Sequence, residues 1–252
     1  MFAEERYQTI IQILEDENSV KVSELTERFG VSESTIRRDL QDMEEKGMLI
    51  RAHGGAVRNP KAHMEPTFQE KEDSHQDDKV LIGKLAASMV HDGDNILIDS
   101  GTTTLELAKN ITAKNITVLT NSIDVARAMS EKEQVEIILT GGTFRSNTRS
   151  MVGPICEQTL RQFKPDKVFL GMNGIALKDG LTTPNLVEAT TKRAMLLSGK
   201  KTYVLADPSK FGNVLLSVVS PIKEISAIIT TKTLGSEIIK AYRENGIKLI
   251  LE

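Results

Sequence analysis

Apolar residues in the first part of the chain recur at helical spacing, and short polar turns interrupt them twice. The pattern predicts one helix from about Glu4 to about Glu15, and a second, shorter helix that Ser23 caps and Gly30 ends. A third helix should begin after Ser32 and close at Gly47. The residues expected on the buried faces of these helices are Tyr7, Ile10, Ile11, Leu14, Leu25, Phe29, Ile36, Leu40 and Met43.

The third predicted helix carries small hydroxyl groups and paired arginines on the side away from its apolar stripe. Two helices joined by a short turn with glycine, the second bearing such a side, are typical of a helix-turn-helix. The next segment, LIRAHGGAVR, is apolar and basic with a Gly-Gly turn, which predicts a wing. Arginine side chains suit guanine edges and phosphates. The predicted DNA-binding residues are Ser32, Ser34, Thr35, Arg37, Arg38, Arg51, His53 and Arg58.

The charge of the chain favours DNA binding only locally. The formal net charge is -3, and residues 1–58 hold more acidic than basic residues. A lone pair of arginines on a helix is usually just solvated, but here the basic residues gather between Arg37 and Lys61. Many of the acidic residues belong instead to the first helix, which need not face DNA. The clustering of basic residues along the sequence therefore favours a DNA contact, although the net charge of the chain does not indicate one.

A change of character follows the wing. Residues 59–78 are polar and charged and include two prolines, which predicts a linker. From residue 79 onward, short apolar runs alternate with glycine-rich or polar loops and with helical segments, as in NILI, ITVL, VEIIL, KVFLG, TYVLA and AIIT. The predicted fold class is therefore α/β, with a winged helix-turn-helix over 1–58 and a doubly wound, mainly parallel sheet over 79–252.

Polar residues of the second predicted domain follow the ends of its strands. Ligands bind beyond the carboxyl ends of strands in such sheets, so we expect these residues to converge on one pocket. The turn DSGTTT offers backbone N–H groups and hydroxyls that can hold a phosphate. Taken singly, each signal is weak, because a Ser-Gly-Thr-Thr turn is more often a plain helix cap. Glu188 and Lys192 could equally form a surface ion-pair ladder.

An ordered series of short motifs runs along nearly the whole chain. It includes VSELTERFGVSESTIRRDLQDMEEKGMLIRAHGGA, DSGTTT, TNS, DKVFLG, GLTTPN, KRAM and ADPSKFG. The series resembles the DeoR family of bacterial repressors of sugar metabolism. The resemblance implies that the paired arginines read the operator. It also implies that the second domain is similar in fold to ribose-5-phosphate isomerase and senses phosphorylated sugars.

With this resemblance, the strand-end residues become a predicted effector site. Its residues are Asp99, Ser100, Gly101, Thr102, Thr103, Asn121, Ser122, Gly141, Gly142, Asn173, Glu188, Lys192, Asp207 and Lys210. Three positions depart from the family pattern: Ala176 replaces an acidic residue, Lys71 an arginine, and Asp78 a glutamate. The sequence therefore leaves the identity of the sugar phosphate open.

A second interpretation stays open from the residues alone, in which the large domain is a working sugar-phosphate isomerase with a DNA-binding appendage. Asp207, Glu188 and Lys210 are conceivable groups for acid–base isomerisation. A plain DNA-bending protein is a third class, but it would leave the strand-end pattern unexplained. The interconversion of ketose and aldose phosphates would separate an enzyme from a sensor.

The remaining expectations concern cofactors, location and partners. The single cysteine, Cys156, excludes a multi-cysteine metal site and is expected to be a buried apolar residue, so no metal or cofactor is predicted. Apolar runs fall short of the roughly 18 residues that span a bilayer, and the start lacks a secretory signal. The sequence thus predicts a cytoplasmic, non-enzymatic repressor of a carbohydrate operon. Its expected partners are operator DNA, a phosphorylated sugar and further copies of itself, as a dimer or tetramer.

Overall fold

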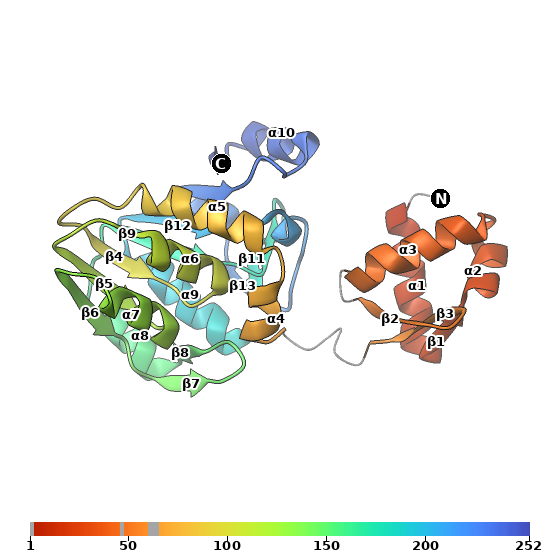
Figure 1. Cartoon of the computed structure of the whole chain (residues 1–252), viewed down its shortest axis with the longest axis horizontal. Coiled ribbons are helices and arrows are strands. Elements are labelled where there is room, and N and C mark those ends of the chain that lie inside the picture. Colours follow the sequence, from red (N-terminus) through yellow and green to blue (C-terminus); the bar gives the residue numbers. More distant parts are fainter. Residues whose placement is uncertain (1–2, 46–47, 60–65) are drawn as a thin grey trace. The chain divides into compact units, whose positions relative to one another are not determined.

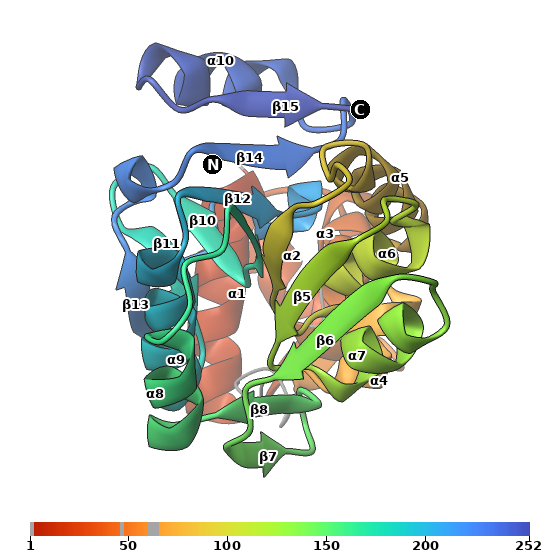
Figure 2. The same cartoon turned by 90° about the vertical axis from the view of Figure 1, so that its left-hand side faces the viewer.

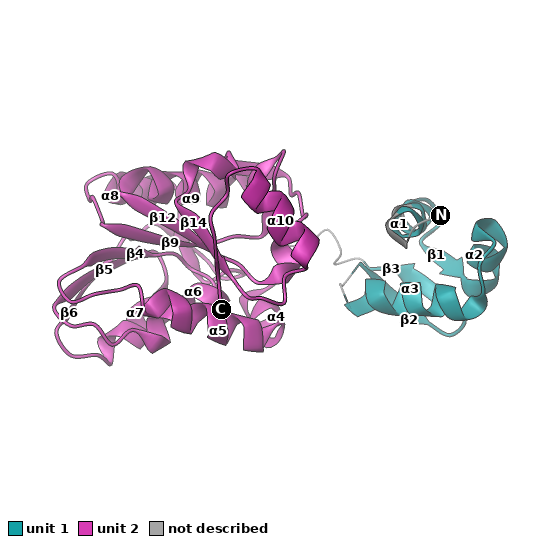
Figure 3. Ribbon diagram, turned by 90° about the horizontal axis from the view of Figure 1, so that it is seen from above, with its two compact units in different colours: residues 1–66 teal, residues 67–252 magenta. Residues whose placement is uncertain are grey.

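A computed structural model describes residues 3–45, 48–59 and 66–252 of the chain. These belong to two compact units, 1–66 and 67–252 (Figure 3). The predicted third-helix end at Gly47 and the basic residues Lys46 and Lys61 lie outside the described residues.

The first unit packs helices against a small antiparallel sheet (Figure 1). Its elements are α1 (Ala3–Glu17), β1 (Ser19–Lys21), α2 (Val22–Phe29), α3 (Glu33–Glu45), β2 (Leu49–Ala52) and β3 (Gly55–Arg58). The sheet order is β1-β3-β2, so the predicted wing is the hairpin of β2 and β3, and β1 is a strand that sequence patterning missed. The buried core includes Ile10, Leu25, Ile36, Leu40 and Met43, as the helical spacing predicted.

The ends of the helices are set by local hydrogen bonds. Gly30 adopts a left-handed conformation (φ 65°) and its N–H donates to the carbonyl of Thr26 at 3.0 Å, which ends α2. Ser32 accepts from the N–H of Thr35 at 3.3 Å and so caps α3 as expected. The prediction that Ser23 caps α2 is wrong. Strand β1 leads directly into the helix at Val22, and Ser23 lies within the first turn.

The second unit is built on a parallel sheet with strands in the order β15-β14-β12-β9-β4-β5-β6. Every neighbouring pair in this order is parallel, which confirms the predicted mainly parallel sheet. The strands are β4 (Asn95–Ile98), β5 (Ile116–Thr120), β6 (Val135–Leu139), β9 (Lys167–Gly171), β12 (Lys201–Leu205), β14 (Ala227–Thr230) and β15 (Leu249–Leu251).

Helices cover both faces of this sheet (Figure 2). On one face, α5, α6 and α7 bury side chains against Ile96 and Ile98 of β4. On the other face, α8, α9 and α10 pack in the core that contains Leu97. The alternation along β4 thus sends neighbouring residues into opposite cores, as a doubly wound sheet requires. The helices are α4 (Phe68–Asp73), α5 (Gln76–Ala87), α6 (Thr102–Asn110), α7 (Ile123–Ser130), α8 (Pro154–Leu160), α9 (Leu186–Ser198) and α10 (Ser236–Glu244).

Two smaller antiparallel pieces join the second unit, and patterning did not predict them. One is the hairpin of β7 (Thr143–Arg145) and β8 (Ser150–Val152). The other is a sheet in the order β10-β11-β13, with β10 (Gly174–Ala176), β11 (Gly180–Thr183) and β13 (Ser217–Ser220). These strands are short and partly polar, so their sequences give little apolar alternation. Short 3₁₀ turns are found at Pro208–Lys210 and Ile222–Glu224.

The predicted linker over 59–78 is corrected by the structure, because its latter part folds with the second unit. Helix α4 begins at Phe68, and α5 begins at Gln76. A capping box starts α4: Glu70 N–H donates to the Thr67 hydroxyl at 3.2 Å, and Thr67 N–H donates to the Glu70 carboxylate at 2.8 Å. Phe68 is buried in the core. The polar composition that indicated a linker belongs to the solvent side of a short helix.

Candidate functional site

The side of α3 away from the core presents the predicted operator-reading residues. Ser34, Arg37 and Arg38 are exposed. The Ser32 hydroxyl lies 2.8 Å from that of Ser34 and 2.9 Å from that of Thr35, so the start of the helix carries a small cluster of hydroxyl groups. Arg37 pairs with Glu33 at 3.2 Å, but both side chains are more than half exposed, so this pair holds the guanidinium only weakly. The α3 surface therefore offers two accessible guanidinium groups.

The wing residues differ in their solvent exposure and in their hydrogen bonds within the unit. His53 in the turn and Arg58 at the end of β3 are exposed. Arg51 is half-buried, and its guanidinium donates to the carbonyl of Arg37 at 3.4 Å, while its N–H donates to the Glu44 carboxylate at 2.9 Å. Arg51 thus ties β2 to α3 in this structure, and its expected contact with phosphate stays a prediction.

The buried side of α3 is fixed to α1 by polar contacts that the sequence analysis missed. Arg6 forms a bidentate pair with Asp39, with Nε to Oδ2 at 2.6 Å and a terminal nitrogen to Oδ1 at 3.0 Å. Tyr7 donates to the Asp42 carboxylate at 3.0 Å. Burial, with that hydrogen bond, raises the pKa of Tyr7 to about 12. Asp39 and Asp42 therefore hold the helix in place instead of opposing DNA on its exposed side.

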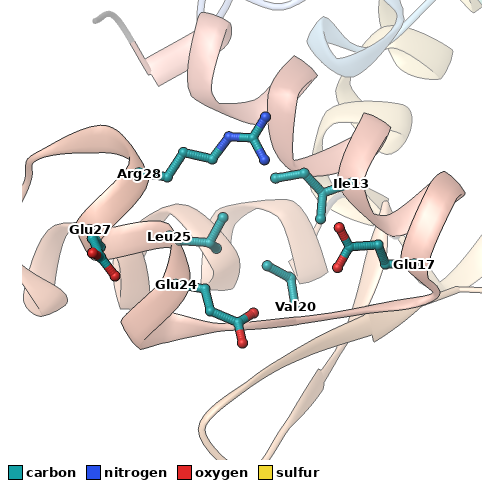
Figure 4. A pocket seen from close by; sticks show the side chains of 7 residues that line it. All are labelled: Ile13, Glu17, Val20, Glu24, Leu25, Glu27 and Arg28. Atoms are coloured by element: carbon teal, nitrogen blue, oxygen red, sulfur yellow. The ribbon is translucent and has the colours of Figure 1, made fainter.

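A shallow depression of about 350 Å³ lies between α1 and α2 (Figure 4). Ile13, Val20 and Leu25 form its apolar floor. The charged side chains around it are Glu17, Glu24, Glu27 and Arg28. Carboxylates repel DNA phosphates, so this part of the first unit is unsuited to face the duplex.

In the second unit, Asp99 is the centre of the predicted strand-end site. It is fully buried directly after β4 and accepts from the N–H of Gly171 at 3.1 Å and from the ammonium of Lys192. Lys192 also donates to the carbonyl of Gly171 at 2.9 Å. Burial raises the pKa of Asp99, and the charge of Lys192 opposes that rise. Lys192 is therefore not part of a surface ladder: it is a buried cation that joins α9 to the ends of β4 and β9.

The turn from Ser100 to Thr103 leads from β4 into α6. Ser100 N–H donates to the Asn121 side-chain oxygen at 2.9 Å, which connects this turn to the end of β5. Gly101 stands at the N-cap and supplies no side chain to cap the first turn of α6. The N–H groups at this helix start carry the positive end of the helix dipole, which suits an anion.

Glu188 forms a second cluster at the start of α9. It accepts from the Thr148 hydroxyl at 2.6 Å and the Thr183 hydroxyl at 3.4 Å, and it pairs with Arg145 at 3.0 Å. Burial alone would raise its pKa, but Lys192, Thr148 and Arg145 outweigh burial and hold the pKa of Glu188 below its ordinary value. Glu188 is therefore a charged acceptor. Asn173 joins the cluster, because its side-chain oxygen accepts from Thr183 at 3.0 Å.

Asp207 and Lys210 follow β12, the neighbour of β9 in the sheet. The buried Asp207 accepts from the Ser209 N–H at 3.0 Å and from the Ser209 hydroxyl, and Lys210 lies 3.6 Å from its other oxygen. Burial opposes ionisation, yet Lys210 and Ser209 hold the pKa of Asp207 below its ordinary value. The strand order β12-β9-β4-β5 therefore brings the loops of Asp207, Gly171, Asp99 and Asn121 into one row.

Some predicted site residues have a clear structural role. Ser122 is buried and caps α7 by accepting from the N–H of Val125 at 3.2 Å. Gly142 has φ 115°, and a Cβ there would lie 2.7 Å from the carbonyl of Val152. Gly141 has φ 68°, so both glycines are needed for the tight path after β6. A ligand contact is not required to explain these residues.

Three residues near the predicted site were missed: Lys79 on α5, Arg145 on β7 and Thr148 in the hairpin. Lys79 is buried beside Asp207 and Lys210, whose charges act on it. Arg145 and Thr148 reach Glu188 across the β7–β8 hairpin. The β7–β8 hairpin was not predicted from the sequence, so these two contacts were missed.

Comparison with known proteins decides the class of this chain. The model of the DeoR-like helix-turn-helix domain matches residues 6–62, and the model of the DeoR C terminal sensor domain matches residues 74–232. The chain belongs to the DeoR family. The predicted resemblance is therefore confirmed, and the protein is a DNA-binding transcriptional regulator.

Full-length relatives agree with this family. The chain is 40% identical to the uncharacterized HTH-type transcriptional regulator FruR of Bacillus subtilis over 92% of each chain. It is 34% identical to the putative aga operon transcriptional repressor of Escherichia coli O157:H7, covering 98% of this chain and 93% of the relative. It is also 32% identical to the HTH-type transcriptional repressor GlcR of Bacillus subtilis, covering 100% and 97%.

The solved structures to which the chain is similar include ribose 5-phosphate isomerase A from Methanocaldococcus jannaschii, at a TM-score of 0.40 and 16% identity over 55% of each chain. Among the helices of the described residues, none is long and apolar enough to cross a membrane.

Proposed function

We propose that this DeoR-family regulator represses a carbohydrate-utilisation operon in the cytoplasm and is released from DNA by a phosphorylated sugar. The names of its relatives support the operon class, since one is a putative repressor of the aga operon. The observation that carries the effector part is the row of charged and hydroxyl groups along the ends of β12, β9, β4 and β5. In this row the buried Lys192 pairs with Asp99, and Lys210 pairs with Asp207, whose pKa is held below its ordinary value.

A sugar phosphate matches the chemistry of that row. Its anionic end suits the uncapped start of α6 together with the ammonium of Lys210. Its hydroxyls can donate to carboxylates, and Glu188 is such an acceptor because its pKa is held low. A sugar without phosphate would make only the hydroxyl contacts with the carboxylates. The phosphate should therefore contribute specifically through Lys210 and the α6 start.

The proposed sensor role is preferred over an isomerase because the family model describes a sensor domain and the relatives are named as regulators. The two functions make different demands. An enzyme must convert ketose and aldose phosphates catalytically, whereas a sensor binds one of them without turnover. Incubation of the full chain with candidate pairs, followed by analysis of the products, separates the two functions.

The proposal is tested by measuring ligand and operator affinity together. A thermal-shift screen of sugar phosphates identifies the effector, since a ligand specific for the native state raises the melting temperature. At saturation this effector should weaken operator binding by roughly 5- to 150-fold, and operator DNA should weaken effector binding by the same factor. Ionic strength must be equal in both titrations, because DNA affinity depends steeply on salt.

We expect Lys210→Ala to weaken binding of the phosphorylated sugar more than binding of the same sugar without phosphate, in calorimetric titrations. The reason is that the ammonium of Lys210 should contact the anionic group rather than the sugar hydroxyls. Lys223→Ala removes an exposed lysine and serves as the matched control, with unchanged affinity for both ligands. Equal losses for the two ligands in Lys210→Ala would place the phosphate elsewhere.

We infer further that a second copy of the chain covers the edge strand β13. Val218 lies in β13, and Val214 and Leu216 lie in the segment just before it; they are 57%, 53% and 89% exposed. An uncovered apolar edge invites pairing with another chain, and helix-turn-helix proteins read two half-sites as symmetric dimers. A second copy therefore accounts for both features.

Leu216→Asp should lower the molar mass in solution, measured by light scattering after size exclusion, because the buried edge would then carry an unpaired carboxylate. Lys223→Asp provides a nearby change of charge that leaves the apolar residues intact. The interface assignment is wrong if Leu216→Asp has the same molar mass as the parent protein. It is also wrong if the parent protein is itself a monomer.

A further inference from the structure

Helix α4 is the first element of the second unit after residues 60–65, and it is held mainly by polar contacts. Its buried side chain is Phe68, whereas residues 69–73 are exposed or half-buried. A helix this short gains little from its own backbone bonds, so its position depends on what ties it down. The described contacts attach α4 at both ends to groups that surround the proposed effector site.

At the end of α4, Lys79 provides the attachment. Its side chain is buried and donates to the carbonyl oxygens of Lys71 and Ser74, which belong to the last turn of α4 and the residue after it. Its own helix, α5, is fixed independently, because Thr231 and Thr233 donate to Asp78 at 2.8 and 3.1 Å. The ammonium of Lys79 on α5 therefore tethers α4, which has few other attachments among the described contacts.

Two charged residues of the proposed effector site influence the same ammonium. Asp207 and Lys210 both act on its charge. Burial lowers the pKa of Lys79 to about 8, Asp207 opposes this shift and Lys210 adds to it. Two ammonium groups that act on each other, one buried and one half-buried, are stabilised when an anion comes between them. A phosphate bound at Lys210 would thus compete with the α4 carbonyls for Lys79.

The start of α4 is attached to the β7–β8 hairpin. Phe68 N–H donates to the carbonyl of Asn147 at 2.8 Å, and the Arg149 guanidinium lies 4.8 Å from the centre of the Phe68 ring. Thr148, between Asn147 and Arg149, donates to Glu188. A surface depression of about 280 Å³ is lined by both elements here, by Thr67 and Gln69 on one side and Ser146 on the other.

We propose that Lys79 is a positioning residue that holds α4 in the unliganded state, and that a bound phosphate draws Lys79 away and releases α4. This inference rests on the proposed effector function and adds how that site is regulated. Helix α4 is the first helix of the second unit along the chain, so its release would alter the start of that unit. The two attachments connect this start to groups around the strand-end loops.

Hydrogen exchange of the full chain tests the proposal, with inorganic phosphate as the probe and sodium chloride at equal ionic strength as the reference. In the parent protein, phosphate should speed exchange of the α4 amides by roughly tenfold, since charge-assisted bonds that hold the helix are lost. Amides in α10 should not change and serve as the internal reference. Lys79→Met should show fast α4 exchange already without phosphate and no further response. Lys84→Met removes an exposed lysine from the same helix and should behave as the parent protein.

The outcomes separate this inference from the function on which it rests. If phosphate raises the melting temperature but leaves α4 exchange unchanged, the site binds anions and the role of Lys79 is wrong. If phosphate neither raises the melting temperature nor alters exchange, the phosphate site itself is refuted. If Lys79→Met still responds to phosphate as the parent does, the tether is not Lys79. The parent-protein comparison needs no variant, so it decides the proposal even if Lys79→Met does not fold.

Discussion

Replacing both Arg37 and Arg38 by alanine should remove the preference of the protein for its operator over random DNA. Both side chains are exposed on α3, and loss of a guanidinium that grips a guanine edge costs on the order of 1 to 3 kcal/mol per arginine. Gel-shift titrations against an operator selected from random DNA, repeated at fixed salt, measure the change. Stability should hardly alter, because the buried Arg6–Asp39 pair that holds α3 is untouched.

Arg28→Ala is the control for this experiment. Arg28 is an exposed arginine of the same unit, but it lies beside the acidic depression of α1 and α2. Its loss should leave operator preference as it is. An intact operator affinity in the double variant would show that α3 does not read the bases.

Lys192→Met should destabilise the second unit by about 3 to 5 kcal/mol near neutral pH, because it leaves the buried carboxylate of Asp99 without its cation. Urea unfolding monitored by circular dichroism measures the loss. The comparison is Lys200→Met, which breaks an ion pair with Asp166 whose side chains are 68% and 34% exposed. That variant should lose at most about 1 kcal/mol.

The loss in Lys192→Met should depend on pH in a defined direction. Burial already raises the pKa of Asp99, and removal of Lys192 raises it further. A carboxyl with a raised pKa in the folded state favours folding at low pH, and this contribution is lost as pH rises through that pKa. The gap between parent and variant should therefore be smaller at pH 5 than at pH 8. Lys192→Met with Asp99→Asn should regain stability, and a gap independent of pH would contradict the buried-charge explanation.

The helices and parallel strands could be predicted because their signals are local. The apolar spacing of Ile36, Leu40 and Met43 predicts one buried helix face in any context that keeps the chain helical. Within β9, Val168, Phe169 and Leu170 are all apolar because the strand is covered on both faces. The capping error at Ser23 arose because Lys21 at the end of β1 is the N-cap of α2, and its N–H donates to the Glu24 carboxylate at 3.2 Å.

The candidate site was predictable only in part, because only some of its contacts follow from local sequence signals. Asp99 and Asn121 follow strands that are neighbours in the sheet, so the strand-end rule was enough to bring them together. The partners of Glu188 could not be derived this way, because Arg145 and Thr148 come from a short hairpin with little apolar pattern. Their contact depends on where β7 and β8 fold back onto α9.

The sequence by itself determined the family, the two-part organisation and the exposed arginines of α3, because each depends on spacing along the chain or on an ordered series of motifs. Only the tertiary structure decided that Lys192 is the buried partner of Asp99, that Arg6 holds Asp39, and that residues 67–78 belong to the second unit. The physical reason is that a charge is costly to bury unless a partner lies within a few ångströms, and that partner is often far away in the chain. Packing, not spacing, selects it.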